Sequence, residues 1–83
     1  MSETSEQMKT SEAARLLGVS ENTLRKYSQA AEKVAGPAYF PRVKNARRYR
    51  PEDLDRLRHL QELVKEGKTV DQAAREVFAG EAA

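Results

Sequence analysis

The chain has 83 residues and a formal net charge of only +2, and it contains no cysteine. One small domain is therefore expected, stabilised by hydrophobic packing without disulfides or a cysteine-based metal site. No apolar run approaches the roughly 20 residues that a membrane-spanning helix needs, and the polar, acidic segment 1–7 is unlike a signal peptide.

The first predicted helix begins near Thr10 or Ser11, because either hydroxyl can cap the free amides at a helix N-terminus. Glu12 then stands in the first turn, where a negative charge is favourable. The apolar positions that should face the core are Ala13, Leu16 and Leu17. Gly18 is expected to end the helix in a left-handed conformation, and Val19 to reach back toward the core.

A second helix is predicted to follow at once, with Ser20 as its N-cap. Its inward positions, at spacings of three and four, are Leu24, Tyr27 and Ala31. Two helices separated only by a short glycine-containing turn are typical of a helix-turn-helix. In that motif the second helix lies in the major groove of DNA, and residues near its N-terminus face the base edges.

The outward positions of this second helix are therefore candidate DNA contacts. We expect Asn22, Arg25 and Lys26 to project toward the bases, because arginine can bind guanine and asparagine can bind adenine through paired hydrogen bonds. Tyr27 is expected to pack its ring in the core while its hydroxyl reaches a phosphate. An ordinary solvated helix face would also account for Arg25 and Lys26.

A β-hairpin is predicted after this helix, because Gly36, Pro37 and Pro41 rule out a continuous helix between residues 35 and 41. Its strands would span residues 39–43 and 47–49, joined through residues 44–46, where Asn45 tolerates a positive backbone angle. A lone hairpin is marginal in water and must lean on the helices. The expected anchors are Tyr39, Val43 and Tyr49.

Basic residues are concentrated between positions 25 and 50, where eight of them stand against one acid, Glu32. This segment carries a charge of +7, so the rest of the chain carries −5. Such asymmetry predicts one face for a polyanion and another for solvent. Four of the cations surround the hairpin tip, close enough to follow phosphates or enter a minor groove: Arg42, Lys44, Arg47 and Arg48.

A solvated basic hairpin is the alternative interpretation of this cluster, although so many like charges repel one another unless a polyanion neutralises them. Glu52 and Asp53 could pair with some of the cations. Arg50 lies beside these acids and is expected to be structural rather than DNA-binding.

Two further helices complete the pattern. Pro51 suits the first position of the third helix, and Gly67 is expected to stop it. Its apolar face comprises Leu54, Leu57, Leu60, Leu63 and Val64. Thr69 and Gln72 form a capping box for the fourth helix, which Gly80 should end. Its apolar face comprises Val70, Ala73, Ala74, Val77 and Phe78.

The predicted fold is mainly α: a winged helix-turn-helix of four helices, with a two-stranded β-hairpin wing between helices 2 and 3. We expect this DNA-binding domain to span residues 9–80, between a flexible N-terminal tail (1–8) and a C-terminal tail (81–83). The lone His59, in the middle of a helix, does not indicate catalysis. No enzymatic activity, catalytic residue, metal or cofactor is expected.

Two runs of the sequence resemble the MerR family of bacterial regulators. Residues 10–20 together with 23–27 (TSEAARLLGVS and TLRKY) are similar to the opening of that family, and residues 47–57 (RRYRPEDLDRL) to its wing and following helix. The resemblance implies a winged helix-turn-helix, with Thr23, Arg25 and Tyr27 on the recognition helix. It also implies that Arg47 is the basic residue of the wing and Tyr49 the aromatic that anchors it.

The chain departs from the family by ending after the fourth helix, so effector sensing is not carried over. The candidate DNA-binding residues are Thr10, Ser20, Asn22, Thr23, Arg25, Lys26, Tyr27, Arg42, Lys44, Arg47 and Arg48, with Tyr39 and Tyr49 as wing supports.

The function expected from these observations is that of a double-stranded DNA-binding domain of a bacterial transcriptional regulator. It would act in the cytoplasm on the nucleoid, without a membrane, as a homodimer formed through a region beyond this chain. One alternative is the DNA-binding head of a chromosome-organising, partition or excisionase-like recombination protein. The other is a helical protein-interaction module that presents Leu60, Leu63 and Phe78 to a partner helix.

Overall fold

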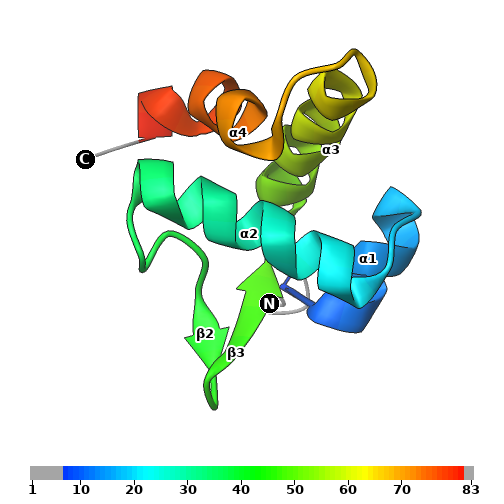
Figure 1. Cartoon of the computed structure of the whole chain (residues 1–83). Helices are drawn as coiled ribbons and strands as arrows, with labels where there is room; N and C mark the ends of the chain where they lie inside the picture. Colours follow the sequence, from blue (N-terminus) through cyan, green and yellow to red (C-terminus); the bar gives the residue numbers. More distant parts are fainter. Residues whose placement is uncertain (1–6, 82–83) are drawn as a thin grey trace.

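The computed structural model describes residues 7–81, which form four α-helices and three short strands (Figure 1). Strand β1 (Met8–Lys9), α1 (Thr10–Leu17) and α2 (Glu21–Ala35) precede the hairpin of β2 (Arg42–Val43) and β3 (Ala46–Tyr49). Helices α3 (Pro51–Lys65) and α4 (Val70–Phe78) and the 3₁₀ turn η2 (Ala79–Glu81) follow. The prediction of a mainly helical fold with a hairpin between the second and third helices is confirmed.

Strand β1 was not predicted, since Met8 was expected in the N-terminal tail. It pairs antiparallel with β3, with Met8 opposite Tyr49 and Lys9 opposite Arg48, and gives the sheet order β1-β3-β2. The rest of that expected tail, apart from residue 7, and the final two residues lie outside the described range. Glu81, expected in the C-terminal tail, belongs to η2.

Helix α1 begins at Thr10, but neither Thr10 nor Ser11 is its N-cap as predicted. Lys9 holds that position, and its backbone N–H donates to Glu12 Oε1 at 3.1 Å. One free amide at this N-terminus is thus satisfied by a carboxylate three residues ahead, and no side-chain hydroxyl caps the helix. Gly18 ends the helix with φ 74°, as predicted.

The buried stripe of α1 is rotated from the predicted one. Ala13, Ala14 and Leu17 are buried, whereas Leu16 is 57% exposed. The stripe is centred between the two alanines, and Leu16 therefore falls outside it. A single short helix does not determine this rotation by its own apolar spacing, because its packing partners select the face.

Helix α2 follows its prediction closely. Ser20 caps it, accepting a hydrogen bond from the Thr23 amide at 3.1 Å. Leu24, Tyr27 and Ala31 are buried, and so is Ser28. The helix lies between α4 on one side and the hairpin on the other (Figure 1).

The hairpin is shorter than predicted and turns more tightly. Residues 39–41 are not in a strand, and Lys44 and Asn45 alone make the turn, with φ of 53° and 68°. Two consecutive left-handed residues match the right-handed twist of the flanking strands. Val43, expected as an anchor, is 41% exposed, because it pairs with Ala46 on the sheet face that points away from α2.

The hairpin is attached to the helices by an aromatic cluster in which Phe40 was not predicted. Phe40 and Tyr49 are completely buried, and their ring centroids lie 5.2 Å apart. Tyr39 is half-buried, with its ring 5.0 Å from Phe40 and 5.5 Å from Phe78. The Tyr49 hydroxyl is 2.7 Å from Ser28 Oγ, and burial raises the pKa of Tyr49.

Helices α3 and α4 close the core from the side opposite the hairpin. The capping box of Thr69 and Gln72 is present as predicted, with both hydrogen bonds made at 3.1–3.2 Å. Helix α4 ends at Phe78, so Gly80 lies inside η2 and does not end the helix itself.

The alternative of a protein-interaction module, with a partner-binding face on these helices, is contradicted by the structure. Leu60 and Phe78 are completely buried and Leu63 is 9% exposed, because all three pack in the domain's own core.

Among residues 7–81, no helix is both long enough and apolar enough to cross a membrane.

Candidate nucleic-acid interface

The first turns of α2 present the side chains that were predicted to read bases. Asn22, Arg25 and Lys26 are exposed. Arg25 Nη1 donates to Asn22 Oδ1 at 2.8 Å, one helical turn away. The hydrogen bond holds the amide and the guanidinium as one unit, while the asparagine NH₂ and the remaining arginine N–H groups still face outward. A preorganised pair of this kind loses less side-chain entropy when it binds.

Three hydroxyl groups of the candidate set lie at helix starts, where they have less freedom. Ser20 Oγ accepts from the Thr23 amide and donates to Thr23 Oγ1 at 3.0 Å, so its first role is to cap α2. Thr23 is half-buried, and Thr10, the first residue of α1, is half-buried too.

Tyr27 was predicted to pack its ring in the core while its hydroxyl stays accessible, and its position is compatible with both. Its side chain packs in the core and only 7% of the residue is exposed. Within the described residues its hydroxyl makes no hydrogen bond, yet no buried side-chain oxygen there lacks a partner. The exposed part of Tyr27 therefore includes the hydroxyl.

The four hairpin cations do not form one surface, because the β-pleat and Glu32 separate them. Arg42 and Arg47 stand opposite each other in the ladder, and both reach the Glu32 carboxylate of α2. Arg47 binds it through two nitrogens, at 3.0 and 2.9 Å, and Arg42 through one, at 3.0 Å. Hydrogen bonding to Glu32 raises the pKa of Arg47.

Repulsion within the hairpin was expected to need a polyanion or pairing with Glu52 and Asp53, but it is Glu32 that neutralises Arg42 and Arg47. In the sequence Glu32 is the single acid of the basic segment, and its position in the fold was not predicted. It lies 10 residues from Arg42 and 15 from Arg47, and only the packing of the hairpin on α2 brings them together. The one available signal was its spacing from Ser28 and Arg25 along the same side of the helix.

Lys44 and Arg48 are the hairpin cations that remain available. Lys44 is exposed at the turn, and Arg48 is half-buried on the sheet face opposite that of Arg47. Strand β1 places Lys9, which was not predicted as a contact, directly across from Arg48. Within residues 7–81 none of these three side chains forms an ion pair, and like charges opposite each other favour an anionic ligand between them.

Arg50 does not belong to this surface, because it is bound to Asp53 at the start of α3. Two of its side-chain nitrogens donate to the buried carboxylate at 2.8 and 3.1 Å, and a further side-chain bond of 3.1 Å reaches the Tyr39 carbonyl oxygen. Hydrogen bonding to Asp53 raises the pKa of Arg50. The residue joins the hairpin to α3, which is the structural role expected from the sequence.

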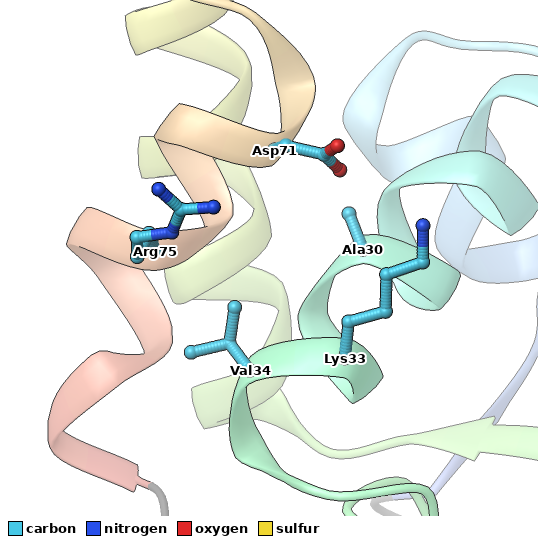
Figure 2. A pocket seen from close by; sticks show the side chains of 5 residues that line it. All are labelled: Ala30, Lys33, Val34, Asp71 and Arg75. Carbon is cyan, nitrogen blue, oxygen red and sulfur yellow. The ribbon is translucent and has the colours of Figure 1, made fainter.

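A pocket lies between α2 and α4 (Figure 2). Helix α4 is on the other side of α2 from the hairpin (Figure 1). The pocket is lined by Ala30, Lys33, Val34, Asp71 and Arg75, as Figure 2 shows. Charges of both signs and the lack of an aromatic wall are unlike a small-molecule site.

His59 is exposed, and residues 7–81 hold no cluster of histidine, cysteine or acidic side chains suited to a metal ion.

Comparison with known proteins agrees with this arrangement. The chain matches the family described as MerR HTH family regulatory protein over residues 8–79, a range that contains the helix-turn-helix, the hairpin, α3 and α4. No curated protein and no solved structure matches it significantly. Because the match covers most of its length, the chain belongs to the MerR helix-turn-helix family and is a DNA-binding domain of a transcriptional regulator, not an enzyme.

Proposed function

We propose that this domain reads a specific double-stranded DNA sequence by placing α2 in the major groove and the hairpin, as a wing, on the flanking phosphate backbone. The observation that carries the proposal is the exposed Asn22–Arg25 pair on the first turns of α2. Both side chains offer the paired donors and acceptors that base edges in the major groove require. Their position is the one from which recognition helices contact bases.

The hairpin supports the proposal through its two free cations. Lys44 at the turn and Arg48 on the outer face extend the basic surface beyond α2, and Lys9 adds a third charge beside Arg48. Contacts of this type set register and affinity rather than sequence preference. The surface therefore divides into a reader on α2 and a phosphate-binding wing.

Binding as a pair of domains on a two-fold symmetric site is part of the proposal. One small domain covers little DNA, and a second copy would raise both affinity and specificity. The DNA partner would place the protein on the nucleoid, in the cytoplasm. Selection of binding sites from a random duplex library tests this directly: a palindromic consensus supports paired binding, and the absence of any enriched sequence contradicts specific recognition.

Replacing Arg25 with alanine should weaken binding to the selected site by about 5- to 150-fold, the loss of roughly 1–3 kcal/mol expected for one base-reading side chain. Binding to random duplex should weaken much less. Kd values from fluorescence anisotropy on both duplexes measure the difference. Lys65→Ala, which removes an exposed cation at the end of α3, is the charge-matched control and should alter neither Kd appreciably. Equal losses on both duplexes would reassign Arg25 to phosphate contact.

Replacing Arg48 with alanine should reduce the dependence of binding on salt. The slope of log K against log salt concentration should become shallower by about 0.9 if one phosphate contact is lost. Titrations at several salt concentrations, on selected and random duplexes alike, measure this slope. An unchanged slope would mean that the hairpin does not contact DNA phosphates through Arg48.

A further inference from the structure

The two arginines on the inner face of the hairpin are held by one carboxylate from the recognition helix. Glu32 lies near the end of α2, and its side chain is only 11% exposed. Its Oε2 atom accepts from both Arg42 and Arg47, and Oε1 accepts a second bond from Arg47. One α2 residue therefore links directly to both strands of the hairpin.

Arg47 and Arg42 are not equivalent in this triad. The Arg47 side chain is 14% exposed and makes the two-nitrogen contact that is the strongest arginine–carboxylate geometry. The Arg42 side chain is 41% exposed and makes a single bond. If Arg42 turned away to a phosphate, the Glu32 charge would still be compensated by Arg47, whereas loss of Arg47 would leave a nearly buried carboxylate poorly paired.

The position of the triad matters for DNA contact. Glu32 lies on the side of α2 that also carries Arg25 and Ser28, and Ser28 contacts Tyr49 of β3. The ion pair and this hydrogen bond therefore join α2 to the hairpin at two points along the helix. The distance from the base-reading turns of α2 to the free cations Lys44 and Arg48 is set by these joints.

We propose that Glu32 is a positioning residue for DNA binding, which fixes the hairpin against α2 through Arg47 so that Lys44 and Arg48 meet the phosphates flanking the groove. Arg47 is then a brace and not a phosphate ligand, and the phosphate contacts come from Lys44, Arg48 and the releasable Arg42. The inference rests on the proposed function, because it assigns residues within that same surface.

The proposal predicts that Glu32→Gln changes DNA binding in the direction opposite to the one expected from charge alone. Glu32→Gln removes a negative charge beside a basic surface, so a Glu32 that merely competed with DNA would give tighter binding and a steeper salt slope in the variant. A positioning Glu32 predicts a shallower slope instead, by about 1.8 when the contacts of Lys44 and Arg48 are both lost. Glu62→Gln, an exposed acid of α3 with the same change in net charge, is the control and should leave the slope unchanged.

A charge exchange separates a brace from a phosphate ligand. Arg47→Glu alone should weaken binding and flatten the slope, since it places two carboxylates together. The double variant Glu32→Arg/Arg47→Glu restores an oppositely charged pair at unchanged net charge, and the carboxylate introduced at position 47 would also stand opposite Arg42 in the ladder. We expect it to return Kd and slope to the wild-type values. Binding as weak as that of Arg47→Glu alone would overturn the proposal.

Hydrogen exchange of the free protein tests the brace without DNA. The Arg48 amide donates to the Pro41 carbonyl oxygen at 2.8 Å and reports on the attached hairpin. It should exchange faster in Glu32→Gln, while amides within α3 keep their protection and show that the variant is folded. Unchanged exchange at Arg48 would contradict the brace. Failure of the wild-type protein to bind DNA would instead refute the proposed function, and the exchange result would still decide whether Glu32 holds the hairpin.

Discussion

Replacing Phe40 with alanine should destabilise the domain by about 3–5 kcal/mol, the cost of a large cavity where an aromatic ring has been removed from a core. Phe40 is 1% exposed, and its ring lies between those of Tyr39, Tyr49 and Phe78 at centroid distances of 5.0, 5.2 and 6.4 Å. The ring therefore joins the segment before the hairpin, the hairpin itself and α4. Domains of this size are stable by only about 5–15 kcal/mol, so the loss would consume much of the total.

Urea and thermal unfolding followed by circular dichroism measure this effect. Each kcal/mol lost should lower Tm by about 4–8 °C in a domain of this size. Phe40→Leu keeps most of the buried volume and should cost far less. A loss below about 1 kcal/mol in Phe40→Ala would mean that the site collapses around the missing ring and that Phe40 does not anchor the hairpin.

Replacing Arg50 with methionine should cost about 3 kcal/mol, because it leaves a completely buried carboxylate without its counter-charge. Asp53 is 0% exposed, and the Arg50 side chain donates two hydrogen bonds to it, at 2.8 and 3.1 Å. The Arg50 side chain is 34% exposed, which places the expected cost at the lower end of the range for buried pairs. The change also removes the bond to the Tyr39 carbonyl oxygen.

Two further variants show whether the buried charge is the cause. Arg58→Met breaks another pair on the same helix, in which Arg58 Nη1 lies 3.8 Å from Asp55 Oδ1 and both side chains are exposed. Its cost should stay below about 0.5 kcal/mol. The double variant Arg50→Met/Asp53→Asn should recover part of the stability lost in Arg50→Met, because the unpaired charge is gone. Equal stability of the single and double variants would exclude the charge as the reason.

The helix-turn-helix could be predicted from local sequence because its determinants are short-range. Ser20 caps α2 through a residue three positions away, Gly18 ends α1 through its own backbone angle, and Thr69 and Gln72 satisfy each other across one turn. Each of these signals acts within a few residues, so no knowledge of the tertiary structure is needed to place it.

The predictions of burial were wrong or incomplete where contacts with residues far away in the sequence determine which side chain is buried. Leu16 fits the helical period of α1 as well as Ala14 does, and only packing against the other helices leaves it exposed. Val43 fits an alternating strand pattern, but the hairpin turn puts it on the outer face. Phe40 belongs to no helical or strand pattern of apolar residues, because it lies outside any strand. Contacts with Tyr49 and Phe78 bury it.

The proposed DNA-binding surface also combines features that local sequence determines with features that depend on tertiary contacts. The sequence by itself determined that the basic residues are concentrated between Arg25 and Arg50 and that Asn22 and Arg25 stand one turn apart on an exposed helix face, since composition and helical spacing are properties of the chain alone. Only the tertiary structure decided which cations are free. Glu32, Arg42 and Arg47 meet because the hairpin folds back on α2, and ion pairs depend on distances of a few ångströms that no spacing along the chain encodes.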